Sequence, residues 1–191
     1  MFTNDNTECS TKISIISQNK FDGWFAKQPL FIKNWCISNN FKGENSKIIK
    51  IPYSDGRLKE VIIGEGTNRD LSGLSQFASL CEGNYYIYSK YALSSDIDIQ
   101  KAWSWGNYKF QMDSKKNSLY VKSEDDLNFL NLYENVINFS RNLINSPANE
   151  INPISFQKKI KNCDLFSKFI FNNYTISDIK FNFPLTYAVG I

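Results

Sequence analysis

The sequence predicts an α/β protein in which a mixed sheet with flanking helices is followed by a long helix and then by the incomplete start of a second α/β domain. Up to residue 122, short stretches of β-branched and aromatic residues alternate with stretches of helical spacing. Residues 124–145 carry apolar side chains at helical spacing without a break. Residues 147–191 return to a mixture of both patterns. Such alternation is typical of helices packed on a sheet.

The first 122 residues divide into short elements. Strands are expected at 12–18, 46–53, 59–64, 85–91 and 118–122. Helices are expected at 21–40, 70–80 and 95–110. Pro29 predicts a break in the first of these helices, and Asp70 is placed to cap the second. The run Ser54-Asp55-Gly56 has the composition of a hairpin turn between the second and third strands.

The long helix is the clearest element of the sequence. Ser123 is a plausible N-cap, and the acidic residues Glu124, Asp125 and Asp126 fill the first turn, where the helix dipole favours negative charge. Pro147 forbids continuation. The helix would be about 33 Å long at 1.5 Å per residue. We therefore predict an α/β domain at 1–122, a linking helix at 123–146 and a further segment at 147–191.

The last segment is expected to begin with a helix at 153–163, capped by Asn152 with Pro153 at its first position. Strands are expected at 174–179 and 185–189. The sequence ends inside this apolar run, which favours an incomplete domain.

Composition excludes several classes of protein. The chain has 191 residues, of which 42% are hydrophobic and 21% charged, so it can form a real core. Its net charge of +3 is small, and its basic residues are scattered, which argues against nucleic acid as a partner. No apolar run approaches the roughly 18 residues needed to cross a membrane. The polar, acidic first ten residues do not resemble a signal peptide, so a cytoplasmic protein is expected.

The residues that usually carry catalysis are scarce. The chain has no histidine, which excludes Ser-His-Asp and Cys-His nucleophiles as well as histidine metal sites. Its cysteines are far apart, with no C-x-x-C pair: Cys9, Cys36, Cys81 and Cys163. A zinc site of ordinary spacing is therefore absent. Any metal would depend on Asp, Glu, Lys or Cys.

Three stretches resemble the cytosol (leucyl) aminopeptidase family. The run 140–149 is similar to the segment that ends the family's interdomain helix, with Asn142 in place of its usual Asp. The run 182–190 is similar to a strand and turn that precede the family's metal-binding sequences, and 102–110 is a weaker match. The matching residues of the first two runs are Arg141, Leu143, Asn145, Pro147, Asn149, Phe183, Pro184, Val189 and Gly190.

The resemblance implies an N-terminal macro-like domain, a linking helix and a C-terminal catalytic domain. Members of the family assemble as hexamers and remove N-terminal amino acids from peptides with two divalent ions, manganese or zinc, held by a Lys, three Asp and a Glu. The three motifs that carry those ligands do not occur in this sequence. No catalytic residue and no metal ligand can therefore be assigned, and the chain alone is expected to be inactive and to serve assembly.

Two other interpretations stay open. The chain could be a non-catalytic macro-like binding or oligomerisation module, or a truncated gene remnant. Gly64-Glu65-Gly66 could form a phosphate-binding loop between a strand and a helix, although an ordinary loop is the stronger interpretation. The aromatic residues of 85–108 could offer a stacking surface for bases, but a core or an interface is the commoner use of such residues.

Overall fold

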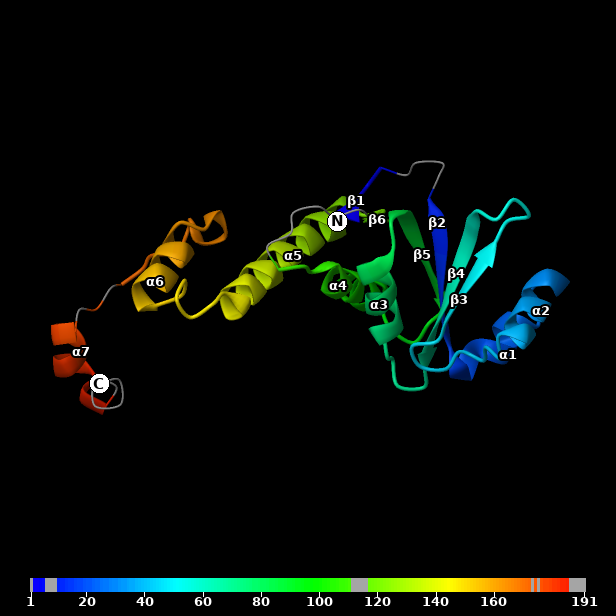
Figure 1. Ribbon diagram of the computed structural model, residues 1–191, viewed down its shortest axis with the longest axis horizontal. Coiled ribbons are helices and arrows are strands. Elements are labelled where there is room, and N and C mark those ends of the chain that lie inside the picture. Colours follow the sequence, from blue (N-terminus) through cyan, green and yellow to red (C-terminus); the bar gives the residue numbers. More distant parts are fainter. Residues whose placement is uncertain (1, 6–9, 111–116, 173, 175, 186–191) are drawn as a thin grey trace. The chain divides into compact units, whose positions relative to one another are not determined.

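The computed structural model describes residues 2–5, 10–110, 117–172, 174 and 176–185 (Figure 1). The chain divides into two compact units, Met1–Asn145 and Ser146–Ile191. The first unit contains a six-stranded sheet with the order β1-β6-β5-β2-β4-β3. Its strands are β1 (Phe2–Thr3), β2 (Thr11–Ser17), β3 (Ile48–Pro52), β4 (Leu58–Gly66), β5 (Gly83–Tyr91) and β6 (Asn117–Tyr120). Among the strands described, only β3 pairs antiparallel, with β4, so the sheet is mixed, as predicted.

Helices cover both faces of this sheet (Figure 1). They are α1 (Phe21–Phe25), α2 (Leu30–Ser38), α3 (Ser72–Leu80), α4 (Asp96–Asn107) and α5 (Glu124–Asn145). Pro29 is extended and directly precedes α2, so the predicted break between the first two helices is confirmed. The predicted hairpin is confirmed as well, because β3 and β4 pair on either side of the turn at Ser54-Asp55-Gly56.

The larger core lies between the sheet and helices α3, α4 and α5. Alternate residues of the central strands, such as Ile13 and Ile15 of β2, point into it. The helices contribute Leu74, Phe77, Ala78, Ile99, Ala102, Trp103 and Leu130, all of them buried. Since each fully buried large side chain stabilises the fold by roughly 1.5–3 kcal/mol, this layer is a main source of stability for the unit.

A second core lies on the opposite face of the sheet. It joins α1 and α2 to β2, β3 and β4 through Phe21, Trp24, Ile32, Cys36, Phe41, Ile16, Ile49, Ile51 and Ile62. Neighbouring residues of β4 serve opposite cores, Val61 and Ile63 one and Ile62 the other. This double burial explains why β4 has a continuous apolar run in the sequence.

Two features of the first unit differ from the sequence prediction. Strand β1 was not predicted, because only two of its residues pair, parallel to Leu119 and Tyr120 of β6, and they lie in a polar segment. Gly64-Glu65-Gly66 was expected to follow its strand as a loop, but it forms the last residues of β4. Hydrogen bonding of the Gly64 backbone to Ser46 and Lys47 extends the strand beyond the β-branched run.

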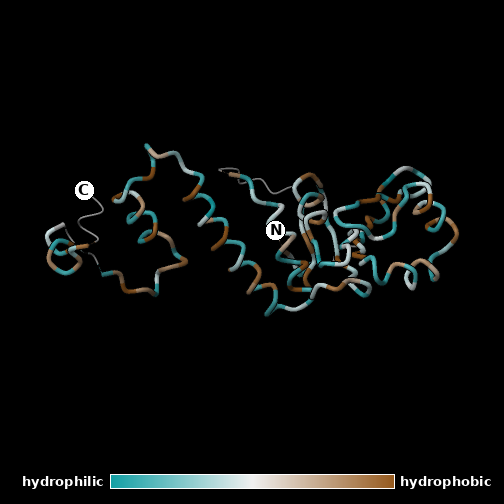
Figure 2. The backbone as a smooth tube through the Cα atoms, turned by 90° about the horizontal axis from the view of Figure 1, so that it is seen from below, coloured by the Kyte–Doolittle hydropathy of each residue, from teal (hydrophilic) through white to brown (hydrophobic). Residues whose placement is uncertain are grey.

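Helix α5 has the predicted bounds. The backbone N–H of Asp126 donates to Oγ of Ser123 at 3.2 Å, so the expected N-cap is confirmed. Apolar and polar residues alternate along its tube (Figure 2). Leu130 is fully buried against the larger core, while Phe129 and Leu132 are exposed.

The second unit contains α6 (Pro153–Lys161), a short 3-10 helix (Asp164–Phe166) and α7 (Ile176–Asn182). Asn152 caps α6 as predicted, and its Oδ1 accepts from the N–H groups of Ile154 and Ser155 at 3.0 and 2.9 Å. The strand expected at 174–179 is wrong, because most of it lies in α7. A helix satisfies its backbone groups locally, whereas a strand needs a paired neighbour. The strand expected at 185–189 falls almost wholly outside the described residues.

Candidate functional site

Two segments that lie more than thirty residues apart in the sequence meet where α4 ends and α5 approaches its own end. The Tyr108 hydroxyl donates to Oδ1 of Asn142 at 3.0 Å and accepts from Nδ2 of Asn145 at 3.0 Å. Nη1 of Arg141 donates to the carbonyl oxygen of Trp105 at 3.2 Å, and its guanidinium lies 5.1 Å from the centre of the Tyr108 ring. These bonds hold the last turns of α5 against the end of α4.

Gly106 lets helix α4 approach α3 closely. A Cβ atom at this position would lie well inside the contact distance of the Ser75 carbonyl oxygen, which belongs to the α3 backbone. The approach is reinforced by the Ser75 hydroxyl, which donates to the carbonyl oxygen of Ala102 at 2.7 Å. The glycine is therefore required by packing.

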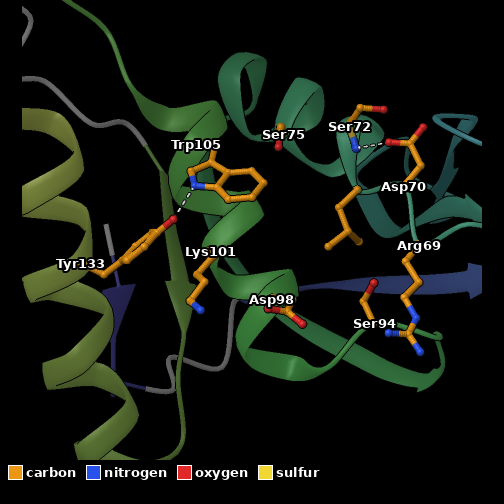
Figure 3. Close-up of a pocket in the computed structure, with 10 residues that line it drawn as sticks. Arg69, Asp70, Ser72, Ser75, Ser94, Asp98, Lys101, Trp105 and Tyr133 are labelled. Carbon is orange, nitrogen blue, oxygen red and sulfur yellow. Dashed lines mark hydrogen bonds between the residues drawn. The ribbon is translucent and has the colours of Figure 1, made fainter. Parts of the chain in front are cut away.

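Beside this junction lies a cavity of about 710 Å³, formed at the starts of α3 and α4 and facing α5 (Figure 3). Its lining is Arg69, Asp70, Leu71, Ser72, Ser75, Ser94, Asp98, Lys101, Trp105 and Tyr133. Helices α3 and α4 follow the parallel strands β4 and β5, which lie on opposite sides of β2. The cavity thus lies at the carboxyl end of the sheet where the chain changes direction, a common place for ligands in α/β proteins.

The two carboxylates of the lining are held by the starts of the helices. Oδ1 of Asp70 accepts from the backbone N–H of Ser72 at 2.9 Å, and Oδ2 accepts from the Ser46 hydroxyl at 3.3 Å. Bonds from the side chain and backbone of Ser72, and then from Ser46, lower the pKa of Asp70 below its ordinary 3.8, against the opposing effect of burial. At the start of α4, Oδ2 of Asp98 accepts from the Ser95 hydroxyl at 2.6 Å.

The aromatic wall of the cavity joins α4 to α5. Nε1 of Trp105 donates to the Tyr133 hydroxyl at 2.8 Å (Figure 3). The Lys101 ammonium lies 5.6 Å from the ring centres of both Phe129 and Tyr133, within the range of a cation–π interaction. Trp105 is nevertheless 45% exposed, so its indole ring is available to a ligand.

A family model described as the N-terminal domain of M17 aminopeptidases matches residues 11–123, which is more than half of the chain. The chain belongs to the M17 aminopeptidase family. The match covers strands β2 to β6 and helices α1 to α4, and ends just before α5; strand β1 precedes it. No curated protein sequence matches the chain.

Solved structures share the M17 fold. The cytosol aminopeptidase of Coxiella burnetii superposes with a TM-score of 0.73 at 20% identity, over 99% of this chain and 43% of that one. A variant of tomato leucine aminopeptidase superposes with a TM-score of 0.58 at 14% identity, over 84% of this chain and 41% of that one. The bottromycin maturation enzyme BotP, in complex with Mn, superposes with a TM-score of 0.57 at 14% identity, over 80% of this chain and 35% of that one. This chain therefore spans less than half the length of each.

The residues that carried the family resemblance fall into separate groups. Arg141, Leu143 and Asn145 lie in α5, and the structure brings Arg141 and Asn145 to Trp105 and Tyr108 of the weaker third match. Pro147, Asn149, Phe183 and Pro184 belong to the second unit, where the Phe183 ring packs edge-on against Tyr174 at 5.5 Å. Val189 and Gly190 lie outside the described residues.

The hypothesis of a phosphate-binding loop at Gly64-Glu65-Gly66 is wrong. Glu65 is fully buried, and its carboxylate oxygens accept from the N–H groups of Leu93 and Ser94 at 2.6 and 2.7 Å. This carboxylate occupies the backbone donors at the end of β5 and repels anions. Tyr85 and Trp103 lie in the core, as the stronger interpretation expected, whereas Tyr86 and Trp105 are exposed. Trp105 faces the cavity.

The residues that the structure describes do not fit the two-metal centre that the family implies. Within the part of the chain that the structure describes, no group of three or more His, Cys, Asp or Glu side chains is arranged to hold a metal ion. No chemical step is assigned to these residues. Among the same residues, no helix has the length and apolar character that crossing a membrane requires.

Sequence analysis missed the cavity residues Arg69, Asp98 and Lys101. The available signal was the pair of helix starts near Asp70 and Ser95, which both follow predicted strands. It could not show that the two starts meet, because the order of the strands was unknown.

Proposed function

We propose that this chain is the assembly part of a peptide-cleaving M17 aminopeptidase, with an α/β domain at 1–122, a linking helix at 123–146 and the first elements of the catalytic domain at 147–191. The observation that carries the proposal is the match of residues 11–123 to the family's N-terminal domain. The likeness in fold to the Coxiella burnetii enzyme, which extends over 99% of the chain, supports it.

The proposed reaction of the whole protein is removal of N-terminal amino acids from peptides by two-metal hydrolysis, with Mn or Zn. The Mn in the BotP structure supports a metal of this kind. The sequence resemblance assigns the metal ligands to motifs that do not occur among these 191 residues. We therefore expect the isolated chain to be inactive.

The proposed role of the chain itself is assembly, with a homohexamer as the expected state and the cytoplasm as the expected location. The relative from Coxiella burnetii is named a cytosol aminopeptidase, which supports this location. Apolar side chains exposed on α5 and α6, including Phe129, Leu132 and Phe156, are suited to contacts with other parts of an assembly.

The gene provides the first test. Sequencing beyond the codon for Ile191 is expected to reveal an open frame that encodes the Lys, Asp and Glu ligand motifs. An immediate stop codon would instead favour a remnant or a repurposed domain. In parallel, purified Met1–Ile191 is expected not to cleave leucine p-nitroanilide with added Mn²⁺. Robust metal-dependent cleavage by a pure sample would disprove the proposal that this chain serves assembly and is inactive alone.

A second candidate function is a binding module, which the cavity beside α3, α4 and α5 favours. Thermal unfolding with ADP-ribose or nucleotides tests whether such a module recognises a nucleotide. A ligand at 100 times its dissociation constant adds about 2.7 kcal/mol of stability. No shift at millimolar nucleotide would count against nucleotide recognition, while leaving the assembly role intact.

A further inference from the structure

We propose that the cavity beside α3, α4 and α5 binds a small zwitterion with an apolar side chain, such as a free amino acid or a very short peptide. The selection of leucine as the representative ligand rests on the proposed aminopeptidase function, because that reaction would release free amino acids. The existence of the site does not rest on it. The argument depends on the charges, the apolar wall and the volume of the cavity.

The charges of the lining are balanced. Asp70 and Asp98 contribute two carboxylates, and Arg69 and Lys101 contribute two cations. Among the described residues, no ion pair joins either cation to either carboxylate. A lining with separate charges of both signs matches a ligand that carries one ammonium and one carboxylate group.

The same arrangement disfavours a nucleotide or another polyanion. A helix N-terminus attracts anions through its free N–H groups, but here carboxylates already lie at both helix starts. Asp70 accepts from the first N–H of α3, and Asp98 lies in the first turn of α4 beside Asp96. A phosphate placed there would meet negative charge instead of free donors.

The positions of the side chains separate a polar end from an apolar end. Asp98, Ser94 and Arg69 gather on one side of the cavity, and the Trp105 ring lies across from them (Figure 3). One oxygen of Asp98 is bonded to Ser95, which leaves its second oxygen for an ammonium group. The Arg69 guanidinium can donate two parallel hydrogen bonds to a carboxylate.

The apolar side chains of the lining are Trp105 and Leu71. The hydrogen bond from Trp105 to Tyr133 fixes the indole ring, so a ligand would lose little free energy in ordering it. Tyr133 belongs to α5, so a bound ligand would contact the linking helix as well as the sheet domain.

The volume fits a small molecule. At about 710 Å³, the cavity lies within the range of about 300–1,000 Å³ that is usual for ligand pockets. A single amino acid would fill part of it and leave room for water, and a dipeptide would fill more.

The test is isothermal titration of the purified full chain, with tryptophan fluorescence as a second readout. L-leucine is titrated to about 20 mM, above the roughly millimolar dissociation constant expected of a ligand with few contacts. Leucinamide lacks the carboxylate, N-acetyl-leucine lacks the ammonium group, and AMP represents a nucleotide. We expect leucine to bind and each blocked form to bind at least about tenfold more weakly, since each loses a charge-assisted bond.

Matched variants locate the site. Asp98→Asn and Arg69→Gln are expected to weaken leucine binding at least about tenfold. Asp125→Asn and Arg57→Gln change the net charge equally but lie outside the cavity, so binding should stay unchanged. Trp105→Phe should abolish the fluorescence response while a calorimetric signal remains. Circular dichroism confirms that each variant is folded.

Several results would overturn the inference: no binding of leucine, equal binding of the blocked forms, tighter binding of AMP, or no effect of the two cavity variants. None of these measurements involves hydrolysis. If the gene lacks the metal-ligand motifs while leucine binds, the proposed function fails and the site stands. If the motifs are present and leucine does not bind, the proposed site fails and the proposed function stands.

Discussion

The two units of the chain are built in different ways. The first, Met1–Asn145, has two buried clusters on opposite faces of one sheet. In the second, Ser146–Ile191, no residue that the structure describes is buried. The exposed side chains there include large apolar ones, such as Ile170 and Phe181 at 93% and 91%. The first unit thus has the means to fold by itself, whereas the described residues of the second unit form no buried core.

The helices of the second unit are stabilised mainly by local interactions. Asn152 and Ser155 form a reciprocal capping box at the start of α6, and lysines fill its last turn, where the helix dipole favours positive charge. Such interactions contribute about 0.5–2 kcal/mol per cap. Helices α6 and α7 have nine and seven residues, and isolated helices shorter than about 12 residues are marginal in water. Local signals therefore define these helices without supplying a stable fold.

The largest contrast is expected from truncating one large side chain in each unit. Trp103→Ala removes a fully buried ring from the larger core and should lower the free energy of unfolding by about 3–5 kcal/mol. Phe181→Ala removes a ring that is 91% exposed and should change it by less than about 0.5 kcal/mol. Urea denaturation followed by circular dichroism measures both. A loss from Phe181→Ala as large as that from Trp103→Ala would show that the second unit is packed after all.

The next effect concerns the approach of α4 to α3. Gly106→Ala would place a methyl group against the Ser75 carbonyl oxygen, and separating the helices should cost about 1–3 kcal/mol. Gly23→Ala is the matched control, because nothing lies within 4 Å of a Cβ there. In α1 it should be neutral or stabilise by up to about 1 kcal/mol. Thermal unfolding of both variants measures the direction of each change in stability. Unchanged stability of the Gly106→Ala protein would contradict the close packing.

A smaller and more local effect is expected where α5 is held at its end. Tyr108→Phe removes the hydroxyl that bonds to Asn142 and Asn145, and should cost about 1 kcal/mol. The loss should appear as faster amide exchange in the last two turns of α5, while the first turns, capped by Ser123, keep their protection. Uniformly faster exchange along α5 would mean that the junction does not act locally.

The difference between the units also explains how far the sequence could predict the fold. In the first unit, burial and local pattern agree: the apolar runs of β2 and β4 are strands because both faces of the sheet are covered. In the second unit, the β-branched stretch near Thr175 and Ile176 suggested a strand, but no described strand lies there to pair with it. Strand formation depends on such neighbours, and their absence is not visible in a local pattern.

The candidate site was only partly predictable, for a related reason. Asp70 was predicted to be the N-cap of α3, but the N-cap is Leu71. Asp70 precedes it and accepts from the backbone N–H of Ser72. That it lines one cavity with Asp98 and Trp105 depends on the strand order, which places β4 and β5 on either side of β2. Side chains brought together by topology leave no spacing pattern in the sequence.

The smallest expected effect is a difference in reactivity between a buried thiol in the first unit and a partly exposed thiol in the second. Burial, with a smaller contribution from Glu60, raises the pKa of Cys36 from 9.0 to about 11. Cys36 is fully buried, whereas Cys163 is partly exposed. Iodoacetamide at pH 8, followed by peptide mass spectrometry, should therefore label Cys163 well before Cys36. Because the folded state holds the Cys36 proton more tightly than the unfolded state, its contribution to stability is complete below pH 9 and declines as the pH rises through 11. Cys36→Ala should therefore reduce the fall in the free energy of unfolding with rising pH. Equal labelling of the two thiols in the folded protein would mean that the second core opens as readily as the second unit.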